Sequence, residues 1–198
     1  MSTRPPATER LIALCGSLRQ GSYNRMLLRA ARELAPARLE IVPQEIGDFP
    51  LYDGDLEARG VPVPVARVKA ALADAHGLLI VTAEYNHSIP GVLKNALDWL
   101  SRGPGLVTRG RPVGVMGASN GMIGTARCQA HLRLVLFTLG AVVMPHPEVL
   151  VALCEEKFAA SGALTDEKTR QVVGKYLDKL ADWVASHPAP PGTSSAGR

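Results

Sequence analysis

Cysteine, aromatic residues and long apolar runs are all scarce in this sequence of 198 residues. The three cysteines, Cys15, Cys128 and Cys154, are an odd number without metal-ligand spacing. We therefore expect reduced thiols in a cytoplasmic protein, with no metal site. No apolar run approaches the roughly 18 residues that a membrane-spanning helix needs, and the N-terminal stretch MSTRPPATER lacks the apolar core of a signal peptide. We expect no association with membranes.

An excess of one charge is also missing. The chain carries 22 Lys and Arg against 18 Asp and Glu, which gives a formal net charge of +4. The basic residues are too scattered to indicate nucleic acid as a partner. A mild positive charge suits small anionic ligands, and a small molecule is the partner that the composition favours.

Apolar strand-like runs alternate with helical patterns along the chain. Such alternation predicts an α/β fold, with a parallel sheet and helices on both of its faces. We expect one domain over 10–186, an N-terminal tail over 1–9, a disordered tail over 187–198, and an irregular segment over 43–62. The last helix is expected to start at Thr165. The predicted strands are 10–15, 38–42, 77–83, 111–117 and 141–144, and the predicted helices are 24–35, 63–74, 90–102, 122–138 and 165–186.

The loop after the first predicted strand reads CGSLRQGSYN (15–24) and leads into a helix. Its hydroxyls, arginine and backbone amides are typical of a phosphate site at a helix N-terminus. A P-loop is excluded because Ser22 stands at the lysine position, and a dinucleotide fingerprint because Leu18 replaces the second glycine. In a cysteine phosphatase Arg19 would follow Cys15 too early. Two interpretations remain, a terminal phosphomonoester site and an ordinary helix cap at Ser22.

Two further loops follow the third and fourth predicted strands, and both would lie at the same edge of the sheet. The first, TAEYNHSIPG (82–91), offers an aromatic ring, an amide and an imidazole that can frame a flat heterocycle. Its alternative is a surface turn with a half-buried tyrosine, and we do not assign His87 as a general base. The second, MGASNGMIGTARCQ (116–129), is rich in glycine, which allows a close backbone approach to a ligand or a purely local turn.

Taken together, these segments resemble the NADPH-dependent FMN reductase family, which has a flavodoxin-like fold and includes quinone, azo-dye and chromate reductases. The resemblance covers about residues 10–150 and rests on GSLRQGSYN (16–24), EYNHSIPGVLKNALDWLSR (84–102) and GASNGMIGTAR (117–127). It implies a three-layer sandwich whose five-stranded parallel sheet has the order 2-1-3-4-5. Two departures are Ala83, where many relatives have proline, and GASNG, where relatives read more like Gly-Ser-Pro-Gly.

The resemblance also implies where FMN binds. The first loop would hold the FMN phosphate, the second would run beside the isoalloxazine, and the third would close the other side. No side chain is expected to be catalytic, because the flavin carries the chemistry. The implied cofactor-binding residues are Ser17, Arg19, Ser22, Tyr23, Asn24, Glu84, Tyr85, Asn86, His87, Ser88, Ser119 and Gly121.

The implied activity is an NAD(P)H oxidoreductase that passes two electrons through bound FMN to a small-molecule acceptor. Quinones, free flavin, azo dyes, nitroaromatics and chromate are the acceptors that the family suggests. The alternative is a flavodoxin-like electron carrier without reductase activity, although such carriers tend to be acidic and this chain is basic. NADPH and NADH are not distinguished. Arg109 and Arg111 would meet a 2′-phosphate or be solvated loop charges, and we favour solvated charges.

Residues 132–139, LRLVLFTL, are apolar nearly all round the predicted helix. One sheet covers only one face of such a helix, so the other face predicts contact with a second copy. The family resemblance points the same way. We expect a homodimer or homotetramer, with Trp99 joining the apolar surface and with Arg127 and Glu148 as candidate interface charges.

Overall fold

The computed structural model describes residues 8–103 and 106–190. Its central layer is a parallel sheet with the strand order β2-β1-β3-β4-β5, and a sixth strand, β6, also pairs with β4. The strands are β1 (Glu9–Cys15), β2 (Leu39–Gln44), β3 (Gly77–Thr82), β4 (Pro112–Ala118), β5 (Val142–Val143) and β6 (Val149–Val151). The helices are α1 (Tyr23–Leu34), α2 (Gly54–Ala58), α3 (Val63–Ala73), α4 (Gly91–Leu100), α5 (Ala126–Thr138) and α6 (Glu167–Ser186), with a 3₁₀ turn, η1, at Cys154–Lys157.

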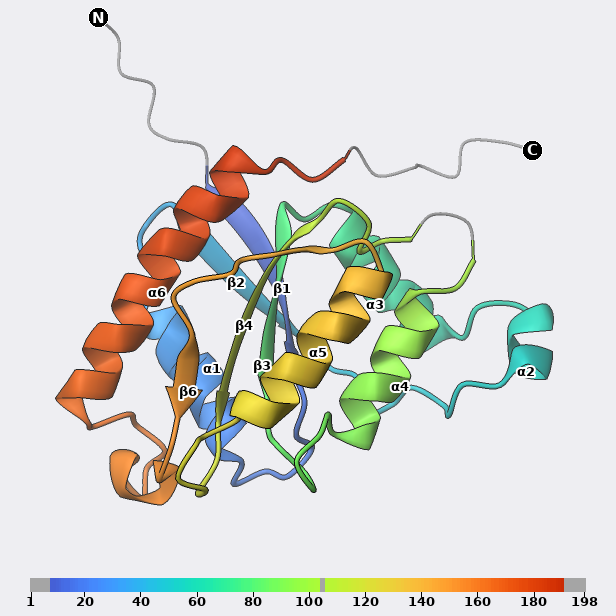
Figure 1. Cartoon of the computed structure of the whole chain (residues 1–198). Coiled ribbons are helices and arrows are strands. Elements are labelled where there is room, and N and C mark those ends of the chain that lie inside the picture. The colour runs from blue at the N-terminus through green and yellow to red at the C-terminus, as the bar shows by residue number, and fades with distance from the viewer. Residues whose placement is uncertain (1–7, 104–105, 191–198) are drawn as a thin grey trace, which may run out of the picture.

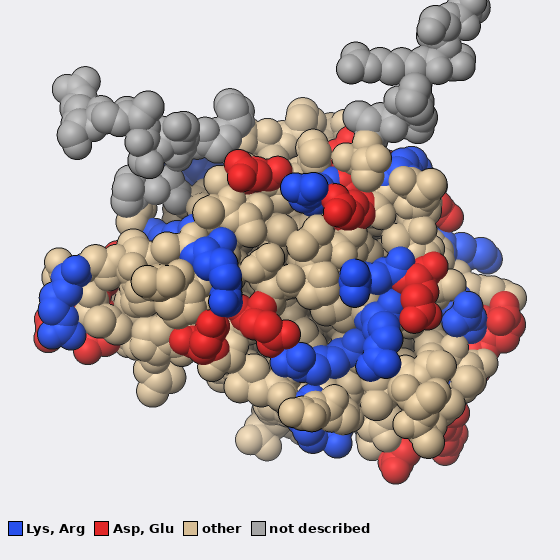
Figure 2. Space-filling model, turned by 180° about the vertical axis from the view of Figure 1, so that it is seen from behind, with Lys and Arg blue, Asp and Glu red and all other residues tan. Residues whose placement is uncertain are grey.

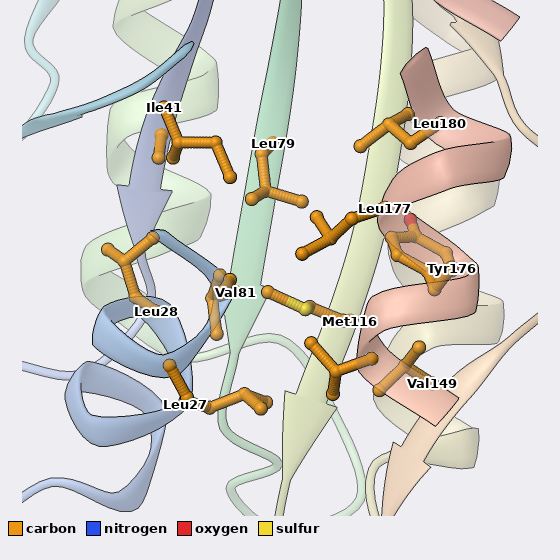
Figure 3. Close-up of a cluster of buried hydrophobic side chains, with 14 of the residues drawn as sticks. Leu27, Leu28, Ile41, Leu79, Val81, Met116, Val149, Tyr176, Leu177 and Leu180 are labelled. Atoms are coloured by element: carbon orange, nitrogen blue, oxygen red, sulfur yellow. The ribbon is translucent and has the colours of Figure 1, made fainter. Parts of the chain in front are cut away.

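Helices cover both faces of the sheet (Figure 1). Helices α1 and α6 pack on one face, and α3, α4 and α5 pack on the other. Figure 3 shows the first of these two cores, where Leu27 of α1 and Leu177 of α6 meet Leu79 and Val81 of β3. Every residue of β3 is buried, because both of its faces lie under helices. The predicted three-layer fold and strand order are confirmed.

The edge of the sheet beyond β4 differs from the prediction. A single strand was expected over 141–144, but the edge consists of two short pieces: β5 pairs with Pro112 and Val113, and β6 pairs with the last three residues of β4. Pro145 and Pro147 lie between the two pieces, and proline has no N–H to continue a ladder. Because β6 pairs with the carboxyl end of β4, it places the following η1 turn beside the loop after β4.

Several predicted boundaries shift for local reasons. Helix α5 starts at Ala126 rather than at 122, because 119–125 form turns. The segment 43–62 contains the short helix α2. Helix α6 is capped by Asp166 rather than Thr165, since the Asp166 carboxylate accepts the Thr169 N–H at 2.8 Å.

The two predicted tails are described only in part. Strand β1 already includes Glu9, within the predicted tail 1–9. In the predicted disordered tail 187–198, His187 stacks on Trp183 with ring centroids 3.8 Å apart, and residues 191–198 lie outside the described residues.

The predicted apolar surface of α5 is present without Trp99. Leu134 and Phe137 are 67% and 79% exposed. Trp99 is 1% exposed, and its indole N–H donates to the Pro50 carbonyl at 2.8 Å, so the expectation that it joins this surface is wrong.

Acidic and basic side chains lie interspersed on the face seen from behind in Figure 2, where a short basic band borders acidic groups. Three ion pairs involve β2 or the segment that follows it: Arg10 with Glu40, Arg25 with Glu45, and Arg67 with Asp48. All three pairs are partly exposed, so each contributes little to stability. They arrange the charges locally rather than as one large patch of a single sign.

Candidate functional site

Three loops converge at the carboxyl ends of β1, β3 and β4, at the lower end of the molecule in Figure 1. We call them loop one (16–22), loop two (83–90) and loop three (119–125). Two neighbouring cavities lie among them. The loop-one cavity, of about 170 Å³, is lined by all three loops, α1 and Cys154. The loop-three cavity, of about 460 Å³, lies between loops two and three and reaches Arg127 of α5.

The structure brings together all but one of the predicted binding residues. Glu84 and Ser119 line both cavities. Ser88 lines neither, and its hydroxyl lies 3.1 Å from Nδ1 of His131. The loop-one cavity also has Ser17, Arg19, Ser22, Tyr23, Asn24 and Tyr85, and the loop-three cavity has Asn86, His87 and Gly121.

Loop one is both a helix cap and a cluster of hydrogen-bond donors. The Ser22 hydroxyl caps α1 by accepting the N–H groups of Asn24 and Arg25 at 3.2 and 3.4 Å. The backbone N–H groups of Ser17, Arg19 and Tyr23 have no partner among the described residues. The Arg19 guanidinium lies 5.7 Å from the centroid of the Tyr23 ring and has no carboxylate within 4 Å in the described chain. The two interpretations of this loop are therefore compatible.

Asn24 connects α1 to the end of β4. Its amide nitrogen donates to the Ala118 carbonyl at 2.9 Å, and its amide oxygen accepts the Ala118 N–H at 2.8 Å. The side chain is 3% exposed. This contact fixes the start of α1, directly after loop one, against the end of β4, directly before loop three, and the sequence did not reveal it. Direct donation from Asn24 to a phosphate stays a prediction.

Ser17 is held by side chains from two directions. Its hydroxyl lies 3.2 Å from the hydroxyl of Tyr85, which reaches over from loop two. Its carbonyl accepts a hydrogen bond from Nε of Arg25 at 3.3 Å. The two terminal nitrogens of Arg25 meet both oxygens of Glu45, at 3.2 and 2.8 Å, in a bidentate pair. Arg25 was not predicted, because its spacing is that of any exposed position on α1.

Loop two contains a tight turn in an unusual backbone conformation. Tyr85 and Ser88 exchange backbone hydrogen bonds of 3.1 and 3.0 Å, and the two residues between them, Asn86 and His87, have φ of 50° and 62°. Two consecutive left-handed residues define a type I′ turn. Left-handed backbone at residues other than glycine persists only where the surroundings hold it, and it is concentrated at binding sites.

Loop two is tied to the first turn of α5. The Glu84 carboxylate accepts the Cys128 N–H at 2.9 Å, so a negative charge sits at the positive end of that helix. The other Glu84 oxygen is 3.4 Å from Nδ1 of His87. Arg127 donates from Nη1 to the same His87 nitrogen at 2.8 Å. An acid, an imidazole and a guanidinium therefore follow one another along the loop-three cavity.

Loop three is packed against β6 and η1. The Ser119 N–H donates to the Val151 carbonyl at 2.9 Å, and the Ser119 hydroxyl accepts the Gly121 N–H at 3.2 Å. Asn120 accepts the Glu155 N–H at 3.0 Å. Asn120 and Cys154 line the loop-one cavity but were not predicted, since β6 and η1, which bring Cys154 here, have no clear sequence signal.

Cys15 and Arg111 do not support the phosphatase and 2′-phosphate interpretations. Burial raises the pKa of the Cys15 thiol, which donates to the Ser17 carbonyl at 3.7 Å, so it is a poor phosphatase nucleophile. Arg111 is 3% exposed and donates to the carbonyls of Ala75 and Val107. The expectation that Arg111 is a solvated charge is wrong, and so is the alternative that it meets a 2′-phosphate.

Over 8–103 and 106–190 no group of three or more His, Cys, Asp or Glu side chains is arranged to hold a metal ion. Within the same ranges, no helix combines the length and apolar character needed to span a membrane.

Known proteins are similar to this chain in sequence and in fold. Residues 10–156 match a family described as NADPH-dependent FMN reductase. An NAD(P)H-dependent FMN reductase of Pseudomonas aeruginosa is 41% identical over 175 residues, which cover 88% of this chain and 95% of that protein. A quinone reductase of Escherichia coli is 43% identical over 177 residues, covering 88% and 94%.

A solved structure agrees with these sequence relatives. It is a flavoenzyme NAD(P)H:(acceptor) oxidoreductase from Paracoccus denitrificans, 38% identical, with a TM-score of 0.84 over 91% of this chain and 100% of that one. The family match over residues 10–156 covers all three loops described above. The chain therefore belongs to the NADPH-dependent FMN reductase family and is an FMN-dependent oxidoreductase that uses NAD(P)H.

Proposed function

We propose that this protein holds FMN across its two cavities and delivers electrons from NAD(P)H to quinone-type acceptors. The observation that carries the proposal is the pairing of a small donor-rich cavity at a helix N-terminus with a larger, partly apolar one beside it. The two share Glu84 and Ser119 as common walls. A cofactor with a phosphate at one end and a flat ring at the other suits such a pair.

The donor set of loop one fits a terminal phosphate. Free N–H groups of Ser17, Arg19 and Tyr23, the Arg19 guanidinium and the positive end of α1 all favour an anion. In the described chain no acidic side chain lines this cavity apart from Glu84, which is bound to Cys128. Ser22 acts mainly through its cap, which fixes the direction of α1.

Loops two and three would position the ring. Bound FMN supplies hydride and electron-transfer chemistry that no side chain here provides. Asn86 and His87, the two residues of the left-handed turn, line the loop-three cavity, and Met122 and Ile123 give this cavity an apolar wall. These two side chains are 79% and 43% exposed, which leaves the cavity accessible to an acceptor.

Quinones are the acceptors that we favour. A quinone is flat and apolar with carbonyl oxygens at its edge, which matches an open cavity with an apolar wall and polar groups at Asn86 and Ser119. The names of the relatives from Pseudomonas aeruginosa and Escherichia coli agree with a reductase rather than a carrier. A steady-state screen of NADPH and NADH against quinones, free flavin and an azo dye tests this choice, and quinones should have the highest kcat/KM.

Arg19→Ala tests the assignment of the phosphate. Charge-assisted hydrogen bonds contribute roughly 1.5–3 kcal/mol, so the variant should bind FMN about 10-fold more weakly or worse. Riboflavin, which lacks the phosphate, should bind as it does to the unmodified protein. Arg29→Ala, elsewhere on α1, is the matched control for loss of one positive charge. Equal losses of affinity for FMN and riboflavin in Arg19→Ala would contradict the assignment of the phosphate to loop one.

The exposed apolar face of α5 supports a second part of the proposal, a homodimer or homotetramer. Leu134 and Phe137 are large, apolar and mostly exposed on the same helix. Of the two candidate interface charges, Glu148 lies 3.8 Å from Arg133 of its own chain, and Arg127 contacts His87. Light scattering at micromolar concentration should give a multiple of 21.0 kDa, and Phe137→Glu should lower it. A mass near one chain would contradict this part.

A further inference from the structure

Loop one is joined to the end of the edge strand β2 by a single guanidinium. Nε of Arg25 donates to the Ser17 carbonyl at 3.3 Å. Nη1 and Nη2 of the same side chain donate to the two carboxylate oxygens of Glu45, at 3.2 and 2.8 Å. Glu45 directly follows β2. Arg25 therefore connects a backbone carbonyl of loop one to a carboxylate that comes from another part of the chain.

Glu45 is itself held in place. Nη2 of Arg67, in α3, donates to the Glu45 backbone carbonyl at 2.7 Å, and the same guanidinium meets the Asp48 carboxylate at 3.1 and 3.2 Å. A Cβ on Gly47 would lie 2.8 Å from Cδ2 of Leu18, so the Leu18 side chain packs closely on the Gly47 backbone. The segment that follows β2 thus contacts loop one at two points, one polar and one apolar.

The hydrogen bond from Arg25 determines which way one peptide group of loop one faces. The peptide bond between Ser17 and Leu18 is trans, so its carbonyl and its N–H point in opposite directions. The Leu18 N–H therefore points away from Arg25, and it has no partner among the described residues. Ser17 and Arg19, on either side of it, line the loop-one cavity. The other donor to the Ser17 carbonyl is the Cys15 thiol at 3.7 Å, which is a weak donor. A rotated peptide would offer a carbonyl oxygen in place of this N–H, and a carbonyl oxygen repels an anion.

We propose that Arg25 and Glu45 are a positioning pair that holds loop one in its anion-binding conformation, so that affinity for the FMN phosphate depends on a carboxylate at the end of β2. The inference rests on the proposed function, because it takes loop one to be the phosphate site. Neither side chain lines the loop-one cavity, so both act through the loop backbone. Removal of a negative charge at Glu45 should then weaken the binding of an anion.

The sign of this effect separates positioning from simple attraction between charges. If charge alone mattered, Glu45→Ala would bind FMN more tightly than the unmodified protein. We expect it to bind FMN about threefold more weakly, as suits the loss of a partly exposed ion pair. Arg25→Ala should bind FMN about tenfold more weakly, because it also loses the hydrogen bond to Ser17. Arg25→Lys keeps the charge without the planar fork and should stay about threefold weaker than the unmodified protein.

Glu40→Ala is the matched control for loss of a carboxylate. Glu40 is on β2 and accepts a hydrogen bond from Nε of Arg10 at 2.8 Å, with no contact to loop one. FMN affinity should be the same in this variant as in the unmodified protein. Riboflavin lacks the phosphate and should bind equally well to all of these proteins. Quenching of flavin fluorescence by the FMN-free protein measures both affinities.

A general loss of stability would not produce this pattern. The side chains of Arg25 and Glu45 are 34% and 63% exposed, so the pair contributes little to stability, and the Tm of Glu45→Ala should fall by less than about 3 °C. Unchanged or tighter FMN binding in Glu45→Ala would overturn the inference. So would full recovery in Arg25→Lys, or an equal loss of affinity for riboflavin. If the unmodified protein binds FMN no more tightly than riboflavin, the proposed phosphate site is wrong, and the inference with it.

Discussion

The Asn24 side chain joins the start of α1, after loop one, to the end of β4, before loop three. Its removal should lower the free energy of unfolding measurably. Asn24→Ala deletes two hydrogen bonds, of 2.9 and 2.8 Å, and leaves the N–H and carbonyl of Ala118 without partners in the interior. An unsatisfied buried polar group costs about 1–3 kcal/mol, so we expect a loss of about 2–4 kcal/mol in the free energy of unfolding. For a domain of this size that corresponds to a fall in Tm of about 5–15 °C.

Urea and thermal unfolding of the FMN-free protein measure this loss, and FMN titration measures its effect on binding. Asn24→Asp is the informative companion, because it keeps an acceptor for the Ala118 N–H but places a carboxylate against the Ala118 carbonyl. Ser119→Ala is the control. It removes one hydrogen bond at an exposed turn and should cost less than about 1 kcal/mol. A fall in Tm below about 2 °C for Asn24→Ala, with unchanged FMN affinity, would refute the reasoning.

Three other predictions concern separate parts of the molecule. Gly117→Ala should unfold the protein or lower its free energy of unfolding in urea by about 3 kcal/mol or more, because a Cβ there would lie 2.3 Å from the backbone oxygen of Thr82 at the end of β3. Gly21→Ala is the control and should be tolerated, because a Cβ at Gly21 would have no atom within 4 Å. Burial raises the pKa of Cys128 and Cys154 to about 11, from an ordinary 9.0. Both thiols therefore stay protonated to a higher pH in the folded state than in the unfolded state. The stability that they contribute is complete below pH 9 and falls between pH 9 and 11, by at most ~3 kcal/mol per thiol. Urea unfolding at pH 8 and 11 should show this fall, and a double alanine variant should show a smaller one; identical slopes would exclude it. Tyr85→Ala should raise the KM for the acceptor while the protein stays yellow, because the ring is 50% exposed and makes one hydrogen bond to loop one; a colourless product would contradict this.

The elements that the sequence predicted best are those whose burial is uniform. Strand β3 is a run of apolar residues because helices cover both of its faces, and its pattern has no competing interpretation. The start of α5 was placed too early, because Met122 and Ile123 continue the apolar spacing of the helix into loop three. Both are exposed, and spacing alone does not reveal that an apolar residue faces a cavity. Strand β6 was missed because three residues after a proline-rich turn form no pattern.

For the candidate site, the sequence predicted the types of residue that gather there but not the partners that each residue contacts. Hydroxyls, amides and an arginine at strand ends were enough to predict which loops lie together around the two cavities. The partners of those residues depend on segments far apart in the chain, as with Asn24 and Ala118, 94 positions away. The order of Glu84, His87 and Arg127 along one cavity likewise exists only once α5 lies beside loop two.

The two edges of the sheet have a consequence for how this protein meets other chains. On one side the edge is broken into strands of two and three residues, β5 and β6. On the other side, β2 contains Pro43, and Nε of Arg32 donates a hydrogen bond to the Ile41 carbonyl at 3.2 Å. An uninterrupted row of free N–H and carbonyl groups, which another chain would need in order to add a strand, is therefore absent from both described edges. A fold with such edges resists strand-to-strand aggregation, and its association with other copies is directed to the surfaces of its helices.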